Sequence, residues 1–304
     1  MDFNDVPPFE GIGHDENGIS WFDCCDYDKY YKERRRISTW SFRCLAEASS
    51  YAQNCVLTLT YDNEHLSKNG SLCLADFQKF IKRLRKRIDP IKVRYFGCGE
   101  YGSKGMRPHY HVILFGWCPD DLVYSHSSCP DVKFYRSRFI SDVWHNGFVV
   151  VCPTVKPKVI PYVCKYLQKF NNIPDGLVRP FTVMSRRPGI GLCALGKSVD
   201  LNTDKIYING KSSSIPRYYL DKLEQLEIMT SMYEDSDGSL EFVPVSIPLD
   251  ELKTFAVLAG IHTRVQSIRD RRASFWKNRF DNQKYINNVK KFKKFSTERD
   301  KPRR

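Results

Sequence analysis

The order of hydrophobic and polar residues divides much of the chain into short strands and amphipathic helices. Four apolar runs rich in β-branched and aromatic residues predict strands, at residues 54–61, 93–99, 109–115 and 148–151. Longer segments with helical periodicity predict helices, at residues 38–52, 74–88, 137–145, 158–170 and 217–229. From residue 54 onward, this order predicts an α+β domain with helices packed on an antiparallel β-sheet.

The helix expected at residues 74–88 has one apolar face and one strongly basic face. Its apolar residues recur at helical spacing, and Pro90 ends the segment. The remaining surface is crowded with basic residues: Lys79, Lys82, Arg83, Arg85, Lys86 and Arg87. This basic face is either solvated or directed at DNA.

The sequence predicts four regions along the chain. Residues 1–37 form a loosely structured N-terminal extension, and residues 38–230 form the main domain. Residues 231–249 are acidic and contain proline and serine, which favours a linker or an exposed loop. Residues 250–304 form a basic helical C-terminal region.

Positive charge is concentrated near the C-terminus of the chain. The whole chain has a net charge of +13. Residues 262–304 contain fifteen Lys and Arg and four Asp and Glu, a net charge of +11. Aromatic residues interleave with these cations, and aromatic rings stack on bases while cations hold phosphates. The segment therefore favours nucleic acid as the partner, in preference to a solvated tail that only aids solubility.

The composition fits a globular protein, with 41% hydrophobic and 27% charged residues. No run of eighteen apolar residues occurs, and the acidic, polar start is unlike a signal peptide. We therefore expect no membrane contact and a cytoplasmic location. The eleven cysteines are odd in number and most stand alone in apolar runs, which predicts buried thiols and no disulfide scaffold.

The first candidate for chemistry is a pair of histidines in the sequence PHYHVILFG, at the start of the strand expected at residues 109–115. Side chains two apart in a strand project to the same face, so His109 and His111 point together. Two neighbouring imidazoles suit a single metal ion. The alternative is a pair of surface histidines, although two uncompensated imidazoles in an apolar strand would be costly.

Glu100 is the expected third ligand of this metal ion. It ends the strand before the glycine turn at residues 101–105, and hairpin pairing can bring it beside the histidines. Two imidazoles and one carboxylate leave coordination positions open, as a catalytic metal requires. The alternative is an exposed carboxylate at a strand end.

A second group of candidate residues lies in the sequence YVCKYLQK, on the helix expected at residues 158–170. Tyr162 and Tyr166 are four apart, so they share a helical face with Cβ atoms about 5–6 Å apart. Lys165 and Lys169 form a second pair with the same spacing. A phenol has an ordinary pKa of about 10, so it needs a cation or a metal to act as a nucleophile. The alternative is a pair of core tyrosines.

These motifs resemble those of a known enzyme superfamily. The sequence from His109 to His111 resembles the histidine–hydrophobe–histidine motif of the HUH endonucleases, YVCKYLQK resembles their two-tyrosine motif, and CVLTLTY resembles the strand that precedes both. The segments TLTYDNEHL, YFGCGEYGSKGMRPHYHVILFG and SRRPGIG are similar to those of microvirus replication initiation proteins, especially the gokushovirus branch. The resemblance covers residues 38–220 and is most specific at residues 93–117.

The resemblance implies an HUH-like fold that nicks and rejoins single-stranded phage origin DNA. Mg²⁺ or Mn²⁺ held by His109, His111 and Glu100 would assist one tyrosine in forming a 5′-phosphotyrosine and a free 3′-OH primer. The second tyrosine would cut the regenerated origin and release a closed circle, with Lys165 and Lys169 stabilising charge. The implied partners in the host bacterial cytoplasm are a DNA polymerase and, because the sequence has no phosphate-binding loop for ATP, a helicase.

Three other functions remain open. Another HUH enzyme, such as a relaxase or transposase, would share these motifs, and a non-catalytic DNA- or RNA-binding protein would use the histidines structurally. A hydrolase with His-x-His on a barrel strand is less favoured, because repeated strand–helix units are missing. Many relatives carry an N-terminal cysteine cluster, but here only the adjacent Cys24 and Cys25 occur, without zinc-site spacing.

Overall fold

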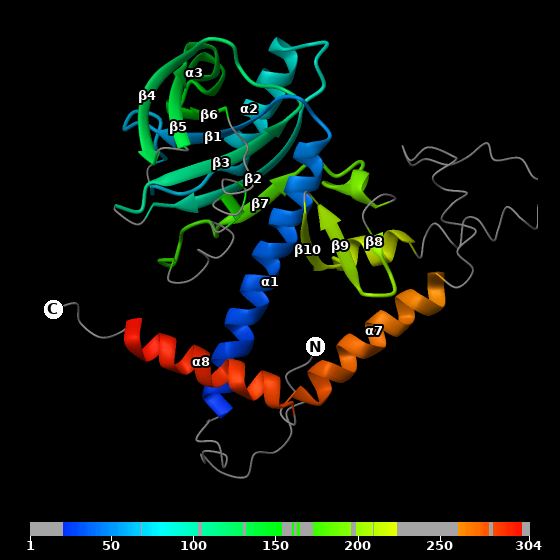
Figure 1. The fold of residues 1–304 in the computed structure, drawn as a ribbon. Coiled ribbons are helices and arrows are strands. Elements are labelled where there is room, and N and C mark those ends of the chain that lie inside the picture. The colour runs from blue at the N-terminus through cyan, green and yellow to red at the C-terminus, as the bar shows by residue number, and fades with distance from the viewer. Residues whose placement is uncertain are drawn as a thin grey trace, which may run out of the picture. The chain divides into compact units, whose positions relative to one another are not determined.

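The computed structural model divides the chain into two compact units, one of residues 37–262 and one of residues 1–36 with 263–304. Figure 1 shows their helices and strands. The residues that the structure describes are 21–67, 69–102, 105–129, 132–153, 160, 163–164, 173–195, 199–208, 210–223, 261–279 and 282–299.

The larger unit is built on a seven-stranded antiparallel sheet (Figure 1). Its strands are β1 (Asn54–Tyr61), β2 (Arg94–Tyr101), β3 (Pro108–Phe115), β4 (Leu122–Cys129), β5 (Val132–Ser137), β6 (Gly147–Cys152) and β7 (Phe181–Met184). Across the sheet they follow the order β4-β5-β6-β1-β3-β2-β7, so β3, which carries the two histidines, has β1 and β2 as neighbours. The predicted α+β class is confirmed.

Helices α2 (Leu74–Arg87) and α3 (Arg138–Trp144) cover one face of this sheet. Alternate residues of the central strands, such as Leu57 and Val112, belong to one buried core with Phe80 of α2 and Trp144 of α3. The ring centroids of Phe80 and Trp144 are 6.0 Å apart. Because side chains alternate along a strand, the intervening residues of β1 and β3 point to the opposite face.

Helix α1 (Trp21–Ser49) packs on that opposite face with its C-terminal half. The ring of Trp40 lies 5.0 Å from the ring of Phe96 on β2. The helix begins well before residue 38, so the prediction of a loosely structured start is wrong for residues 21–36. Local periodicity did not reveal this segment, because its apolar residues pack against the distant C-terminus.

The smaller unit joins residues 21–36 of α1 to α7 (Ile261–Lys277) and α8 (Gln283–Arg299). Asp28 of α1 accepts hydrogen bonds from the Tyr285 hydroxyl at 2.7 Å and from Arg279 Nε at 3.0 Å. A small buried core surrounds these contacts, formed by Cys24, Tyr27, Tyr285, Ile286 and Val289. The predicted helical character of the basic C-terminal region is confirmed by α7 and α8.

Several strands were not predicted from the sequence. They are β4, β5 and β7 of the main sheet, and β8 (Val199–Asp200), β9 (Lys205–Ile208) and β10 (Lys211–Ser214), which form a separate small sheet in the order β10-β9-β8. These strands are short or rich in polar residues, so pairing with their neighbours and not local pattern defines them.

Three expected segments are only partly described. Of the helix expected at residues 158–170, residues 160, 163 and 164 are described and are helical; of that expected at 217–229, residues 217–223 are helical. The expected acidic linker at residues 231–249 lies outside the described residues. The four predicted regions therefore stay a prediction.

The described helices include none that is both long enough and apolar enough to cross a membrane. The cysteines within the described ranges form no disulfide, as predicted. Cys55, Cys98, Cys152 and Cys164 are buried, whereas Cys73 is half-buried. The thiols therefore act mainly as small apolar side chains of the core.

Candidate active site

The two histidines of β3 lie on the sheet face opposite α2 and α3, and two threonines of β1 hold them. The register pairs His111 with Thr58 and His109 with Thr60. The Nδ1 atom of His111 is 3.2 Å from Thr58 Oγ1, and that of His109 is 2.8 Å from Thr60 Oγ1. Both rings are thus oriented by a hydroxyl from the neighbouring strand.

Glu100 reaches the same face from β2, on the other side of β3. It pairs directly with His109 in the ladder, and its Oε1 atom lies 3.2 Å from His111 Nε2. The side chains of Glu100 and His111 are almost fully buried, whereas His109 is half-buried. The hairpin pairing expected from the sequence therefore brings all three residues together.

The donor chemistry of this cluster fits a divalent cation. In the tautomer in which Nδ1–H donates to threonine, each Nε2 atom keeps a lone pair that a cation can accept. The centroids of the two rings are 6.5 Å apart, and His111 Nε2 is hydrogen-bonded to the carboxylate. In this arrangement, no group of three or more His, Cys, Asp or Glu side chains within the described residues is already shaped as a metal site.

The glycine turn between β2 and β3 passes close to His109. The backbone N–H of Gly102 donates to Arg107 O at 2.9 Å, which closes the turn. A Cβ atom at Gly102 would lie only 2.8 Å from His109 Nε2. Glycine at this position therefore leaves room for the imidazole edge that faces the turn.

The tyrosines of β1 and β3 are poor candidates for a nucleophile. Tyr110 lies between the two histidines in sequence, but it points to the core under α2 and α3. Burial raises the pKa of Tyr110 to about 12 and raises the pKa of Tyr61 further. The two hydroxyls are hydrogen-bonded to each other at 3.0 Å, so their role is to bind the core together.

Asp62, an alternative third ligand, has a different set of contacts. Its Oδ1 atom accepts hydrogen bonds from the backbone N–H of His65 and from the ring Nδ1 of His65, both at 2.8 Å. The backbone hydrogen bond is the main cause that lowers the pKa of Asp62. This carboxylate therefore stabilises the turn that follows β1.

The predicted nucleophiles Tyr162 and Tyr166, and the predicted lysines Lys165 and Lys169, lie outside the described residues. Three residues of the same segment are described and are fully buried: Ile160, Val163 and Cys164. The Cys164 thiol is hydrogen-bonded to that of Cys44 on α1. The described part of the segment is therefore anchored in the core of the larger unit.

The sequence analysis missed the two threonines and a neighbouring aromatic residue. Phe148 of β6 pairs with Thr60 on the side of β1 away from His109. It is 67% exposed, although it lies in a strand of the main sheet. The alternation of Thr58 and Thr60 with leucine in CVLTLTY was the available signal for a polar strand face.

Comparisons with known proteins agree with this arrangement of motifs. Residues 54–171 match the family model of the replication-associated protein ORF2. The chain is 33% identical to the replication-associated protein VP4 of Bdellovibrio phage phiMH2K, over 60% of this chain and 61% of that protein. It is 32% identical to the replication-associated protein ORF4 of Chlamydia phage 1, over 69% of this chain and 54% of that protein.

A third relative is the replication-associated protein ORF2 of Spiroplasma virus 4, which is 30% identical over 61% of this chain and 63% of that protein. The aligned part of the chain thus spans between 54% and 63% of the length of these relatives. No solved structure matches the chain. The resemblance to microvirus replication proteins is confirmed by these comparisons.

Proposed function

Because the chain is related to replication-associated proteins of small phages, we propose that it is a metal-dependent endonuclease that starts rolling-circle replication. It would nick the single-stranded phage origin and later rejoin the displaced strand into a circle. The observation that carries this proposal is the cluster of His109, His111 and Glu100 on one sheet face, with both imidazoles oriented by threonines.

In this proposal His109, His111 and Glu100 hold a Mg²⁺ or Mn²⁺ ion. When bound, the ion acts as a Lewis acid on the scissile phosphate. Thr58 and Thr60 keep the imidazole rings in position, and outer contacts of this kind fix ring orientation at metal sites. The burial of Glu100 and His111 limits water around the developing negative charge, which strengthens its electrostatic stabilisation.

The proposed nucleophiles are Tyr162 and Tyr166, as the sequence motif predicts. One phenol oxygen forms a bond to the scissile phosphorus while the bond to the 3′ oxygen breaks. The products are a 5′-phosphotyrosine and a 3′-OH that a host polymerase can extend. Lys165 and Lys169 stabilise charge on the phosphate, whichever tyrosine attacks.

The second tyrosine completes the cycle in this scheme. It cuts the regenerated origin, and the 3′-OH released by that cut attacks the first phosphotyrosine to close a circle. The covalent bond conserves the energy of the phosphodiester, so joining needs no ATP. Unwinding ahead of the polymerase is assigned to a host helicase, and the reaction to the host cytoplasm.

The DNA strand is proposed to cross the open sheet face next to the histidines. Phe148 is the exposed aromatic residue adjacent to Thr60 on this face. Exposed aromatic rings beside cations are typical of single-stranded DNA sites, because every base has a face that can stack. A base next to the scissile phosphate would stack on Phe148.

The test is covalent adduct formation on single-stranded phage origin DNA. The protein is incubated with the DNA and Mn²⁺, and a denaturing gel reports a protein–DNA adduct. We expect EDTA or His111→Ala to abolish the adduct while DNA binding persists, and His126→Ala, at an exposed histidine of β4, to leave it unchanged. DNA binding without any adduct in Mn²⁺ would instead support a non-catalytic DNA-binding protein.

A further inference from the structure

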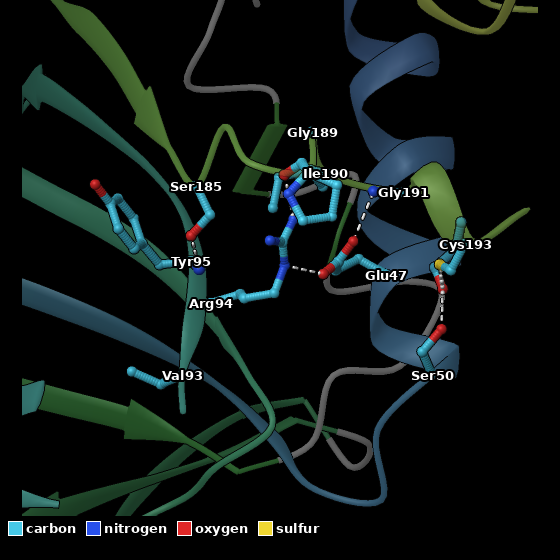
Figure 2. Close-up of polar contacts among 12 residues, drawn as sticks. Glu47, Ser50, Val93, Arg94, Tyr95, Ser185, Gly189, Ile190, Gly191 and Cys193 are labelled. Atoms are coloured by element: carbon cyan, nitrogen blue, oxygen red, sulfur yellow. Dashed lines mark hydrogen bonds and ion pairs between the residues drawn. The ribbon is translucent and has the colours of Figure 1, made fainter. Parts of the chain in front are cut away.

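A basic loop, Ser185–Gly191, follows β7 and is held to the body of the larger unit by buried charged residues (Figure 2). Arg94 of β2 donates to Glu47 of α1 and to Pro188 O, the latter at 2.7 Å. The second carboxylate oxygen of Glu47 accepts the backbone N–H of Gly191 at 2.7 Å. One carboxylate therefore connects the sheet, helix α1 and the end of the loop.

A second buried cation holds the loop from the α1 side. Arg43 donates to Ile190 O at 2.9 Å. Its guanidinium carbon lies 4.3 Å from the centroid of the Trp40 ring and 4.0 Å from that of Tyr218. The Tyr218 hydroxyl in turn accepts the backbone N–H of Gly189 at 3.1 Å. The guanidinium is thus sandwiched between two aromatic rings beneath the loop.

The two glycines of the loop allow this close packing. A Cβ atom at Gly189 would lie 2.4 Å from the Tyr218 hydroxyl, and one at Gly191 would lie 2.6 Å from Arg43 O. Gly191 also has φ +80°, in the left-handed region that favours glycine. The path of the loop is therefore fixed by the sequence PGIG and by the groups that surround it.

The clamped loop presents two arginines to solvent. Arg186 and Arg187 are exposed, as is Pro188. Within the described part of the chain, neither of the two guanidiniums forms a hydrogen bond or an ion pair. Buried Arg43 and Glu47 are costly to desolvate and are a poor source of net stability. Their contacts are better explained by the fixed backbone they give to two exposed cations.

We propose that the loop Ser185–Gly191 is a clamp for the phosphates of duplex DNA that flanks the nicked single strand. Two adjacent guanidiniums on a fixed backbone match the phosphate backbone, which positions DNA without reading its sequence. The exposed tip, Arg186 to Pro188, has no aromatic side chain on which a base could stack. The partner is therefore the DNA backbone and not splayed-out bases.

The location of the loop sets its distance from the proposed active site. Ser185 and Tyr95 are joined by two hydrogen bonds, of 2.9 and 3.1 Å. Tyr95 precedes Glu100 by five residues on β2, which is about 17 Å along the strand. That is the rise of about five base pairs of duplex. The clamp would therefore hold the duplex about five base pairs from the nick, an inference that rests on the proposed function.

The test measures binding in EDTA, so that it does not depend on nicking. Fluorescence anisotropy compares a single strand carrying only the nick site with the same strand extended by a duplex stem. We expect Arg186→Gln/Arg187→Gln to weaken binding of the extended DNA and to reduce its salt slope by about 1.8. Binding of the single strand alone should be unchanged.

Two further variants make the result specific. Lys133→Gln/Arg217→Gln removes two exposed cations elsewhere on the larger unit and should leave both affinities unchanged. Arg186→Lys/Arg187→Lys keeps the charge and should restore the salt slope. Equal loss of affinity for both DNAs, or no loss for the extended DNA, would overturn the clamp. Neither result bears on nicking, which the adduct assay tests separately.

Discussion

The hydrogen bond between Thr58 and His111 offers a sharp test of how the proposed metal site is built. Thr58→Val keeps the shape of a β-branched residue and removes only the hydroxyl, 3.2 Å from His111 Nδ1. The His111 side chain is buried, with 6% of its surface exposed, so water cannot readily take the place of the hydroxyl. Loss of a partner for a buried polar group costs about 1–3 kcal/mol.

The expected result is weaker metal binding. A cost in this range corresponds to a loss of about 10–100-fold in metal affinity, as found for outer contacts of metal-binding histidines. Thr60→Val should have a smaller effect, because half-buried His109 can recruit water. The assay is the rate of origin nicking as a function of Mn²⁺ concentration, with the maximal rate at saturating metal largely retained.

Two variants control this experiment. Thr58→Ser restores a hydroxyl and should return the titration midpoint most of the way to wild type. Thr182→Val alters a threonine on β7 whose buried hydroxyl has no hydrogen-bond partner among the described residues. An unshifted midpoint for Thr58→Val, or an equal shift for Thr182→Val, would refute the role of the threonine hydroxyls.

Three other predictions address the metal, the DNA strand and the smaller unit. Glu100→Gln should raise the Mn²⁺ requirement for nicking at least about 10-fold, because the only anionic ligand is lost; an unchanged titration would exclude Glu100 as a ligand. Phe148→Ala should weaken single-strand binding by about 1–3 kcal/mol in an anisotropy assay without changing the melting temperature, and a loss no larger than that of Val123→Ala, another exposed strand residue, would contradict base stacking. Lys284→Gln/Lys291→Gln on α8 should lower the salt slope of DNA binding by about 1.4–1.8, and an identical slope would make these helices a solubility or protein-binding element.

The sequence predicted most of the sheet that carries the site, because its strands have a strong local signal. β1 has the bounds expected for residues 54–61, and β3 begins one residue before the strand expected at 109–115. The pairing of Glu100 with His109 followed from one glycine turn, since a hairpin turn sets the register of both strands. These features depend on residues close together in the chain.

Features that depend on distant segments were not predicted. The helix at residues 21–36 is stabilised by Tyr285 and Arg279, more than 200 residues away. The loop Ser185–Gly191 was recognised only as a motif, because its conformation depends on Arg43 and Glu47 of α1. Long-range contacts of this kind leave no periodic signal in the local sequence.

The central claim is that a tyrosine in the segment YVCKYLQK becomes covalently linked to DNA. Its most direct test is the identification of the DNA-linked peptide after Mn²⁺-dependent nicking, by protease digestion and mass spectrometry. We expect the linkage at Tyr162 or Tyr166, retained in part by each single Tyr→Phe variant and absent from Tyr162→Phe/Tyr166→Phe. Tyr124→Phe, at an exposed tyrosine of β4, should behave as wild type. An adduct that persists in the double variant, or that maps to another residue, would contradict the claim.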